Sequence, residues 1–210
     1  MTEHKTMNTI IHAAFRRDIA RISDALAAFP AGSRQRADQL GAAWGNLAMQ
    51  LHHHHEDEEA IFWPVLRQGG KNDAVIGELE GEHQAMLAAL DTADGAMKNF
   101  VADPSSEAQA SAQSSVGALR SVLDSHLAHE ERDLEPVGAA MVGTKELKTA
   151  IAATRKKRSS VAGTFFSWLQ DGAGPDEITA LRHEVPPPVL FMLTKLKGGD
   201  YRKRVAAVWK

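Results

Sequence analysis

The chain has 210 residues, of which 43% are hydrophobic, and a formal net charge of −3 at pH 7. This length and apolar content allow one domain with a buried core and exclude a disordered chain. The net charge gives no indication of binding to nucleic acid or to a membrane surface. Cysteine is absent, which excludes disulfides, iron–sulfur clusters and thiolate zinc sites and is typical of a cytoplasmic protein. Because the sequence has neither a leader pattern nor an apolar stretch of about 18 residues, we expect no signal peptide and no membrane span.

Apolar residues recur at helical spacing along the chain, whereas the alternation typical of strands is weak. The spacing predicts four long helices, over residues 9–29, 34–67, 72–101 and 106–142. The second is expected to carry Ile61 and Val65 on its inner stripe and to stop at Gly69-Gly70. The fourth is expected to kink near Pro136. Because the connections are short, we expect an all-α fold built on an antiparallel up-and-down four-helix bundle.

A fifth amphipathic helix is predicted over residues 145–170, and a tail with prolines and a basic end follows from Gly172. The tail is too short for a core of its own, so we interpret it as a short helical C-terminal extension packed on the bundle. The expected division is therefore a bundle over residues 1–143 and a fifth helix with extension over residues 144–210. The aromatic side chains expected to dock the second part on the first are Phe165, Phe166, Trp168 and Trp209.

Histidine and glutamate interrupt the apolar stripes that the four helices are expected to turn inward. The interrupting residues are His12 on the first helix, His54 and Glu58 on the second, His83 on the third, and His126 and Glu130 on the fourth. Burying imidazoles and carboxylates without partners costs on the order of several kcal/mol each. A cluster of cations removes that cost, and the core of a helical bundle is where such sites are built. The sequence therefore predicts a metal site made by these six residues.

The second and fourth helices carry the same motif. His54 precedes Glu58 by four residues, as His126 precedes Glu130, and a proline follows both motifs at the same distance. Residues four apart on a helix point the same way from adjacent turns. Imidazole and carboxylate ligands without sulfur suit iron, manganese or zinc. Two carboxylates among four or more histidines indicate two metal ions bridged by the glutamates.

These residues resemble the hemerythrin and HHE cation-binding family over roughly residues 8–142. The segments that match are Ile11-His12, His54 to Pro64, Glu82-His83 and His126 to Glu131. The resemblance implies a non-haem pair of iron ions with an oxo or hydroxo bridge, held by the same six residues, with manganese or zinc as alternatives. It also implies reaction with dioxygen, hydrogen peroxide or nitric oxide. The tail looks like the extension of some actinobacterial members.

The third helix departs from the family pattern. Oxygen-carrying hemerythrins have a second histidine one turn after the third-helix histidine, and the residue at that position here is Leu87. His55 could supply the missing imidazole. The change favours redox chemistry, with peroxide disproportionation as the expected turnover, over reversible oxygen carriage. The alternatives are a non-enzymatic sensor of oxygen, nitric oxide or iron, an iron-binding protein, and a structural zinc bundle.

Several ionisable residues lie close to the predicted ligands in the sequence. Glu59 or Glu131 could orient a ligand imidazole, and His129 is expected beside the ligands or at the surface. His52 and His53 cannot face inward together with the other two histidines of the run, because a helix turns by about 100° per residue. The residues expected on solvated faces are Glu56, Asp57, the basic run from Arg155 to Arg158 and, unless they orient a ligand, Glu59 and Glu131.

Other metal-site patterns fit the sequence less well. Glu80 and His83 match the ExxH motif of ferritin-like carboxylate sites, but a second copy on another helix is missing. His55-Glu56 begins a zinc-protease motif, which fails because residue 59 is glutamate. His183 lies outside the motifs and is expected at the surface.

Overall fold

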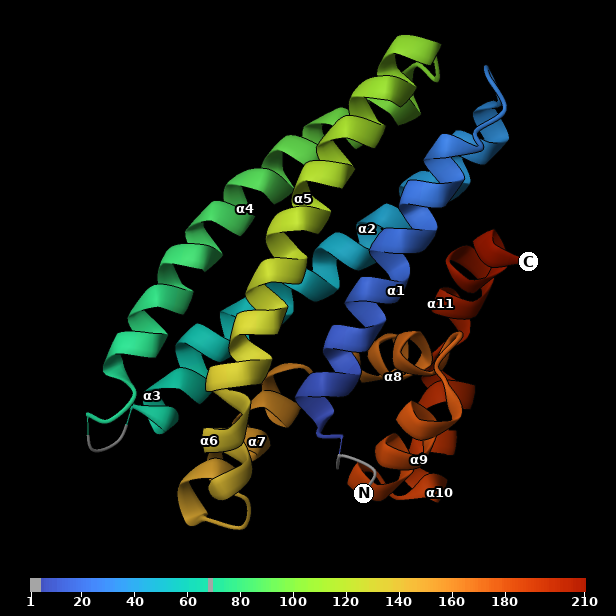
Figure 1. Cartoon of the computed structure of the whole chain (residues 1–210). Helices are drawn as coiled ribbons and strands as arrows, with labels where there is room; N and C mark the ends of the chain where they lie inside the picture. Colours follow the sequence, from blue (N-terminus) through green and yellow to red (C-terminus); the bar gives the residue numbers. More distant parts are fainter. Residues whose placement is uncertain (1–4, 68–69) are drawn as a thin grey trace.

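The computed structural model describes residues 5–67 and 70–210, which are helical almost throughout and contain no strand (Figure 1). The all-α class predicted from the sequence is therefore confirmed. Gly69, at which the second helix was expected to stop, lies outside the described residues. Within the described ranges, no helix combines the length and the apolar character that crossing a membrane requires.

Four long helices make up the first two thirds of the chain. They are α1 (Met7–Ala27), α2 (Arg34–Asp57), α4 (Asp73–Ala102) and α5 (Ser106–Asp133). Helix α5 packs against α4 and α1, and α2 packs against the same two helices from the other side (Figure 1). The four helices therefore share one core, whose buried residues include Phe15, Ile19, Ile22 and Leu26 of α1 and Met86 and Leu90 of α4.

Hydroxyl side chains cap the start of three of these helices. Thr6, Ser33 and Ser105 each accept a hydrogen bond from the backbone N–H three residues further along. Each cap satisfies one of the backbone donors that the first turn of a helix leaves unpaired. These caps set the starting points of α1, α2 and α5.

The second predicted helix is not continuous. The chain continues beyond α2 as a π-helical segment η1 (Glu58–Phe62) and then α3 (Trp63–Leu66). A π-helical turn holds more residues than an α-helical turn, so the residues that follow it are rotated about the helix axis. Trp63 and Leu66 are consequently buried, whereas Ile61 and Val65, expected on the inner stripe, are only half-buried. The prediction for these two positions was wrong because it assumed an uninterrupted α-helix.

The kink expected in the fourth helix is present. Helix α5 ends at Asp133, and α6 (Glu135–Ala140) begins with Pro136 in its first turn. Proline lacks the backbone N–H that a helix interior uses, so it fits the start of a new helix. Leu134 at the junction is buried with Trp63 and Leu79 in a small apolar cluster.

The predicted fifth helix is two helices, and the tail adds several short ones. The elements are α7 (Lys145–Lys157), α8 (Ala162–Gln170), α9 (Pro175–Glu184), α10 (Pro187–Met192), η2 (Leu193–Lys197), α11 (Gly199–Arg204) and η3 (Ala206–Trp209). The prediction of one continuous helix over residues 145–170 was wrong. Arg158 ends α7 and binds acidic residues of α2, and the weak helix formers Ser159 and Ser160 follow it.

The C-terminal helices pack on α1 through a buried aromatic side chain. Trp168 of α8 is fully buried, and its Nε1–H donates to Asp18 Oδ2 of α1 at 2.8 Å. Arg17 donates to the carbonyl oxygen of Trp168 at 3.1 Å. The hydroxyl of Tyr201 in α11 donates to Asp171 at 2.9 Å, which ties the later helices to the end of α8. The extension therefore shares the core of the four long helices.

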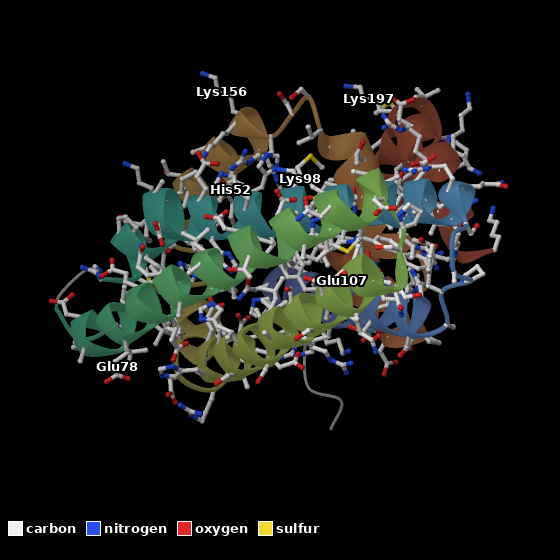
Figure 2. The ribbon with its side chains drawn as sticks, turned by 90° about the horizontal axis from the view of Figure 1, so that it is seen from above. His52, Glu78, Lys98, Glu107, Lys156 and Lys197 are labelled. Carbon is white, nitrogen blue, oxygen red and sulfur yellow. The ribbon has the colours of Figure 1, made fainter. Side chains whose placement is uncertain are left out.

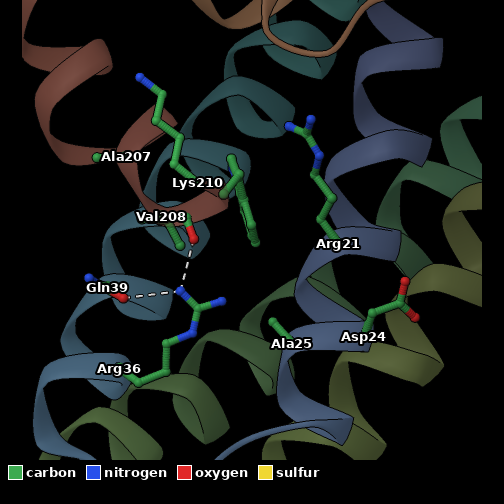
Figure 3. A pocket seen from close by; sticks show the side chains of 9 residues that line it. Arg21, Asp24, Ala25, Arg36, Gln39, Ala207, Val208 and Lys210 are labelled. Carbon is green, nitrogen blue, oxygen red and sulfur yellow. Dashed lines mark hydrogen bonds between the residues drawn. The ribbon is translucent and has the colours of Figure 1, made fainter.

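The larger of the two hollows described on the surface has a volume of about 770 Å³ (Figure 3). Arg21 of α1 and Arg36 of α2 approach it from opposite sides, and Lys210 lies at its rim. Arg36 donates to the carbonyl oxygen of Val208 at 2.8 Å. None of the predicted metal ligands lines this hollow.

Candidate metal centre

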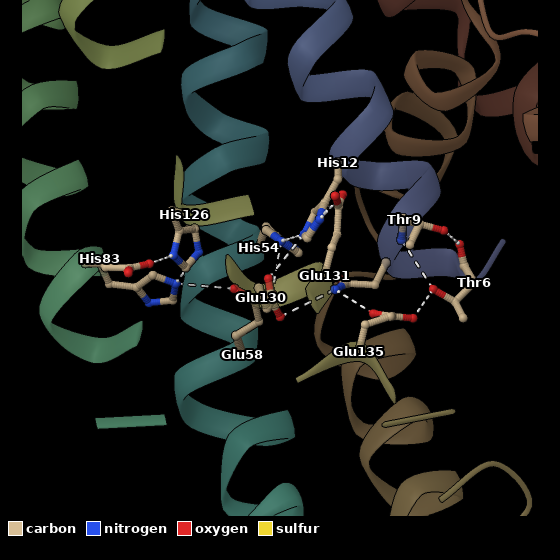
Figure 4. Close-up of polar contacts among 12 residues, drawn as sticks. Thr6, Thr9, His12, His54, Glu58, His83, His126, Glu130, Glu131 and Glu135 are labelled. Atoms are coloured by element: carbon tan, nitrogen blue, oxygen red, sulfur yellow. Dashed lines mark hydrogen bonds and ion pairs between the residues drawn. The ribbon is translucent and has the colours of Figure 1, made fainter. Parts of the chain in front are cut away.

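The six predicted ligands converge between the four long helices (Figure 4). His12 comes from α1, His54 from α2, His83 from α4 and His126 from α5, and a glutamate accompanies the second and the fourth. All of these side chains are 8% exposed or less. A buried set of imidazoles and carboxylates is a chemically suitable place for metal ions.

The six predicted ligands and His55 form two groups of four residues, which share Glu58. Within each group, one ligand atom from each residue lies within 4.8 Å of all the others. We name them the His12 group, which comprises His12, His54, Glu58 and Glu130, and the His55 group, which comprises His55, Glu58, His83 and His126. Glu58 belongs to both groups. His55, which could supply the imidazole that is missing at Leu87, thus lies in the second group.

Ring nitrogens face one another in each group. His12 Nε2 lies 3.2 Å from His54 Nε2, and His83 Nε2 lies 3.2 Å from His126 Nε2. At that distance two lone pairs repel one another unless a proton or a cation lies between or beside them. The facing nitrogens therefore favour a bound proton or cation between or beside them.

Carboxylates fix the opposite nitrogen of three of these rings. His12 Nδ1 lies 2.9 Å from Glu131, and His83 Nδ1 lies 2.8 Å from Glu59. His126 Nδ1 lies 2.9 Å from an oxygen of Glu82. A carboxylate acceptor keeps the proton on Nδ1, so the Nε2 lone pair is directed into the centre. This is the arrangement that histidines adopt when they bind metals.

Four buried polar atoms of the centre have no hydrogen-bond partner among the described residues. They are His55 Nε2, both carboxylate oxygens of Glu58, and Glu130 Oε2. Imidazole nitrogens lie beside these oxygens, with His54 Nε2 3.0 Å from Glu58 Oε1 and His12 Nε2 3.3 Å from Glu130 Oε2. The other oxygen of Glu130 accepts a hydrogen bond from Asn8 at 3.4 Å. Each unpaired buried atom costs about 1–3 kcal/mol, and a charged one costs more. Metal ions at the two groups would satisfy all four atoms, so the residues present fit a two-metal site.

Burial and neighbouring charges shift the pKa values of these groups. Burial raises the pKa of Glu58 well above its ordinary value, and the nearby Glu130 adds to that shift. Burial lowers the pKa values of His54 and His55, and the surrounding imidazoles lower them further, so both rings are held neutral. Burial also acts to lower the pKa of His12, but Glu130 and Glu131 outweigh it and raise that pKa to about 9. Neutral imidazole is the form that binds metals, and the carboxylates beside His12 attract positive charge.

Aromatic side chains line the centre. The indole of Trp63 stacks on the His83 ring with centroids 4.4 Å apart, and Phe15 lies 5.3 Å from His54. Trp63 and Phe15 are fully buried. The centre is therefore bounded by apolar surface that excludes water and strengthens electrostatic interactions inside it.

The remaining predicted residues lie outside the two groups. His129 Nδ1 lies 2.7 Å from Glu82, so it touches the carboxylate that orients His126. His52 is exposed and His53 is half-buried. Glu82 directly precedes His83, but its role in orienting an imidazole was not predicted from the sequence. Its role depends on the packing of α4 against α5, which no sequence spacing indicates.

One charged residue that the sequence predicted on a solvated face is buried instead. Asp57 is buried, and Arg158 Nε lies 2.9 Å from it. Lys157 Nζ lies 2.8 Å from the same carboxylate, and Glu56, which is exposed as predicted, pairs with both basic residues. The prediction for Asp57 was wrong because it treated α2 and α7 separately, whereas the fold brings their charged residues together. Glu80, the candidate for a ferritin-like ligand, instead pairs with Arg67 at 2.7 Å.

Comparison with known families agrees with this geometry. No curated protein and no solved structure matched the chain. The model of the hemerythrin HHE cation binding domain matches residues 9–137, which contain every residue of the two groups. Because this match covers more than half of the 210 residues, the chain belongs to the hemerythrin HHE cation-binding domain family.

Proposed function

We propose that the chain binds two iron ions, one at the His12 group and one at the His55 group, bridged by Glu58. The observation that carries this proposal is the sharing of Glu58 by both groups while neither of its oxygens has a hydrogen-bond partner among the described residues. His12, His54 and Glu130 complete one position, and His55, His83 and His126 complete the other. We further propose that the four long helices form the antiparallel up-and-down bundle expected of the family.

The donor set supports iron over the alternatives. Five imidazoles and two carboxylates without sulfur are ligands that iron, manganese and zinc accept. A single zinc ion would need only three or four of these groups and would leave the others buried and unpaired. Membership of the hemerythrin family favours iron among the three metals.

We infer that the centre reacts with dioxygen or with reactive species such as hydrogen peroxide or nitric oxide, and that peroxide disproportionation is its turnover. The iron pair, when bound, would supply the redox chemistry. Glu59, Glu82 and Glu131 hold protons on the Nδ1 atoms of three imidazoles, and this fixes the direction of their Nε2 atoms. The buried rings of Trp63 and Phe15 keep water away from His83 and His54, which they contact.

A sensor without turnover is the second candidate, and one set of contacts favours it. The ring centroid of Phe15 lies 5.3 Å from that of His54 and 5.2 Å from that of Trp168. Phe15 therefore packs against both a proposed ligand and the extension. Trp168 in turn donates to Asp18. A shift of His54 would reach α8 through these packed rings, which makes residues 144–210 a candidate output region beside a metal-binding region of residues 1–143.

Metal analysis with an absorption spectrum of iron-supplied protein tests the metal assignment. We expect about two iron ions per chain and near-ultraviolet absorption typical of oxo-bridged ferric pairs, which zinc cannot give. His12→Ala, His54→Ala and Glu58→Ala should each lower the iron content. Iron that stays at about two per chain in all three variants would show that the assignment is wrong.

Peroxide turnover separates the two functional candidates. The iron-loaded protein should release oxygen from hydrogen peroxide faster than the same concentration of free iron. A rate no better than free iron, together with a change in tryptophan fluorescence when nitric oxide or oxygen is added, would favour the sensor.

A further inference from the structure

Helix α10 and the segment η2 expose an apolar face. Only five large hydrophobic side chains are strongly exposed among the described residues, and four of them lie on this one segment. Phe191 is 63% exposed, Met192 52%, Leu196 77% and Val189 39%. Exposed apolar side chains that cluster on a protein surface mark an interaction site, whereas exposed apolar side chains scattered singly do not.

The opposite face of the same segment is firmly packed. Leu190 is 4% exposed, and η2 makes extensive contacts with α8. Gly163 of α8 approaches the backbone of Lys197 so closely that a Cβ on it would lie 2.5 Å from the Lys197 carbonyl carbon. A helix that is apolar on both faces is normally buried all round. The outer face of α10 and η2 is therefore held in a fixed orientation with its apolar side chains uncovered.

The segment that carries this face is rich in basic residues. The stretch from Pro187 to Val205 contains five basic residues and one acidic residue, although the whole chain carries a net charge of −3. Lys195 and Lys197 are both exposed on η2. The Cβ of Lys197 lies against Gly163 of α8, but its side chain reaches the outer edge of the molecule (Figure 2). Arg202 donates to the carbonyl oxygen of Lys195 at 3.2 Å, which places a further cation beside them. The total charge conceals this local excess.

We propose that the outer face of α10 and η2 binds an anionic lipid surface, with Phe191, Met192 and Leu196 entering the headgroup region and Lys195 and Lys197 contacting lipid phosphates. Basic residues beside exposed Phe and Leu are the composition of segments that lie in the membrane interface. The segment also combines two contributions to reversible membrane binding, which are the insertion of apolar side chains and the attraction of lysines to anionic headgroups. This proposal is independent of the metal centre.

Two other occupants fit the patch less well. A second copy of the chain would bring two sets of basic residues together, and like charges at an interface are strongly unfavourable. A stable protein interface uses about 20–30 residues a side, whereas this patch consists of a few side chains on a single short helical segment. The charge and the small size both favour the lipid surface.

Co-sedimentation of the full chain with vesicles tests the proposal. We expect binding to vesicles of phosphatidylcholine and phosphatidylglycerol (3:1), and little binding to phosphatidylcholine alone. The double variant Phe191→Ser/Leu196→Ser should bind about tenfold more weakly, since it removes two inserting side chains. Lys195→Glu/Lys197→Glu should weaken binding by a similar factor. Salt at 0.5 M should weaken wild-type binding, because it shortens the screening length from about 8 Å at physiological salt and so reduces the attraction between lysines and lipid phosphates.

Matched variants elsewhere on the surface control for composition. Val142 is 72% exposed on another part of the chain, so Val142→Ser should change vesicle binding by less than about twofold. Lys145→Glu/Lys148→Glu, which changes two exposed lysines of α7, alters the net charge equally and should likewise have little effect. Phe191→Leu keeps an apolar side chain and should retain binding, and circular dichroism shows that each variant is folded.

Three results would overturn the proposal. The first is that wild-type protein sediments no more with the anionic vesicles than the Phe191→Ser/Leu196→Ser variant does. The second is that both pairs of lysine substitutions weaken binding equally, which would indicate a general effect of charge. The third is that wild-type protein binds no vesicles and forms a dimer that the Phe191→Ser/Leu196→Ser variant cannot form, in which case a second copy covers the patch.

Discussion

The four long helices carry two different kinds of core. At one end α1, α2, α4 and α5 meet through apolar side chains such as Leu26, Leu40 and Phe100, all fully buried. Phe29 and Phe100 pack edge to face there, with ring centroids 4.7 Å apart. At the other end the same helices bury histidines and glutamates, several of whose polar atoms have no hydrogen-bond partner within residues 5–67 and 70–210. The apolar end stabilises the fold, whereas the polar end is arranged to bind cations at a cost to the stability of the metal-free chain.

Glu58→Leu gives the largest expected effect on this contrast. It removes the one side chain common to both groups, so we expect both metal ions to be lost. The metal-free variant should at the same time be more stable than the metal-free wild type, by about 1–4 kcal/mol, because a buried carboxylate is replaced by an apolar group of similar volume. Metal analysis and urea unfolding measure the two effects. Glu80→Leu, at an exposed glutamate of α4, is the control and should keep about two ions per chain.

His55→Leu should remove one ion and leave the other. His55 belongs to only one of the two groups, so the metal content should fall from about two to about one ion per chain. His53→Leu is the matched control, because the neighbouring residue is half-buried and belongs to neither group. An unchanged metal content in His55→Leu would mean that His55 is not a ligand.

Leu47→Ala tests the apolar end. Leu47 is fully buried on α2, and its truncation should lower the free energy of unfolding by about 2–5 kcal/mol. The metal content should stay at about two ions per chain, since no residue of either group is altered. Denaturant unfolding of the metal-free and metal-loaded protein should show similar destabilisation. A loss of metal in the folded variant would contradict the separation of the two ends.

Asp18→Asn should have the smallest effect of the four. It removes the charged acceptor of the Trp168 Nε1–H and a partner of Arg17, and should lower the free energy of unfolding by about 1–2 kcal/mol. We expect the near-ultraviolet circular dichroism of tryptophan to change while the metal content does not. Asp24→Asn, at an exposed position of the same helix, should leave both measurements unchanged.

Local sequence patterns determined the helices and the composition of the proposed centre. The 3.6-residue period places His12, His83 and His126 on the buried stripes of their helices, because burial of a stripe depends only on the spacing along one helix. The paired histidine and glutamate motifs are equally local, so the positions of Glu58 and Glu130 followed from the sequence. The membership of the hemerythrin family was recognised from the same residues.

Contacts between helices decided the rest. The π-helical turn that begins at Glu58 rotates the residues that follow it about the helix axis. Trp63 is therefore buried in the core in place of Ile61. Glu82 orients His126, and Arg158 binds Asp57, only because residues far apart in the chain lie side by side. Spacing along one helix specifies which residues face inward but not which residue of another helix they meet. The sequence by itself therefore indicated six of the seven side chains in the two groups and left His55 open. The tertiary structure determined how the seven are divided into two groups and what holds them in place.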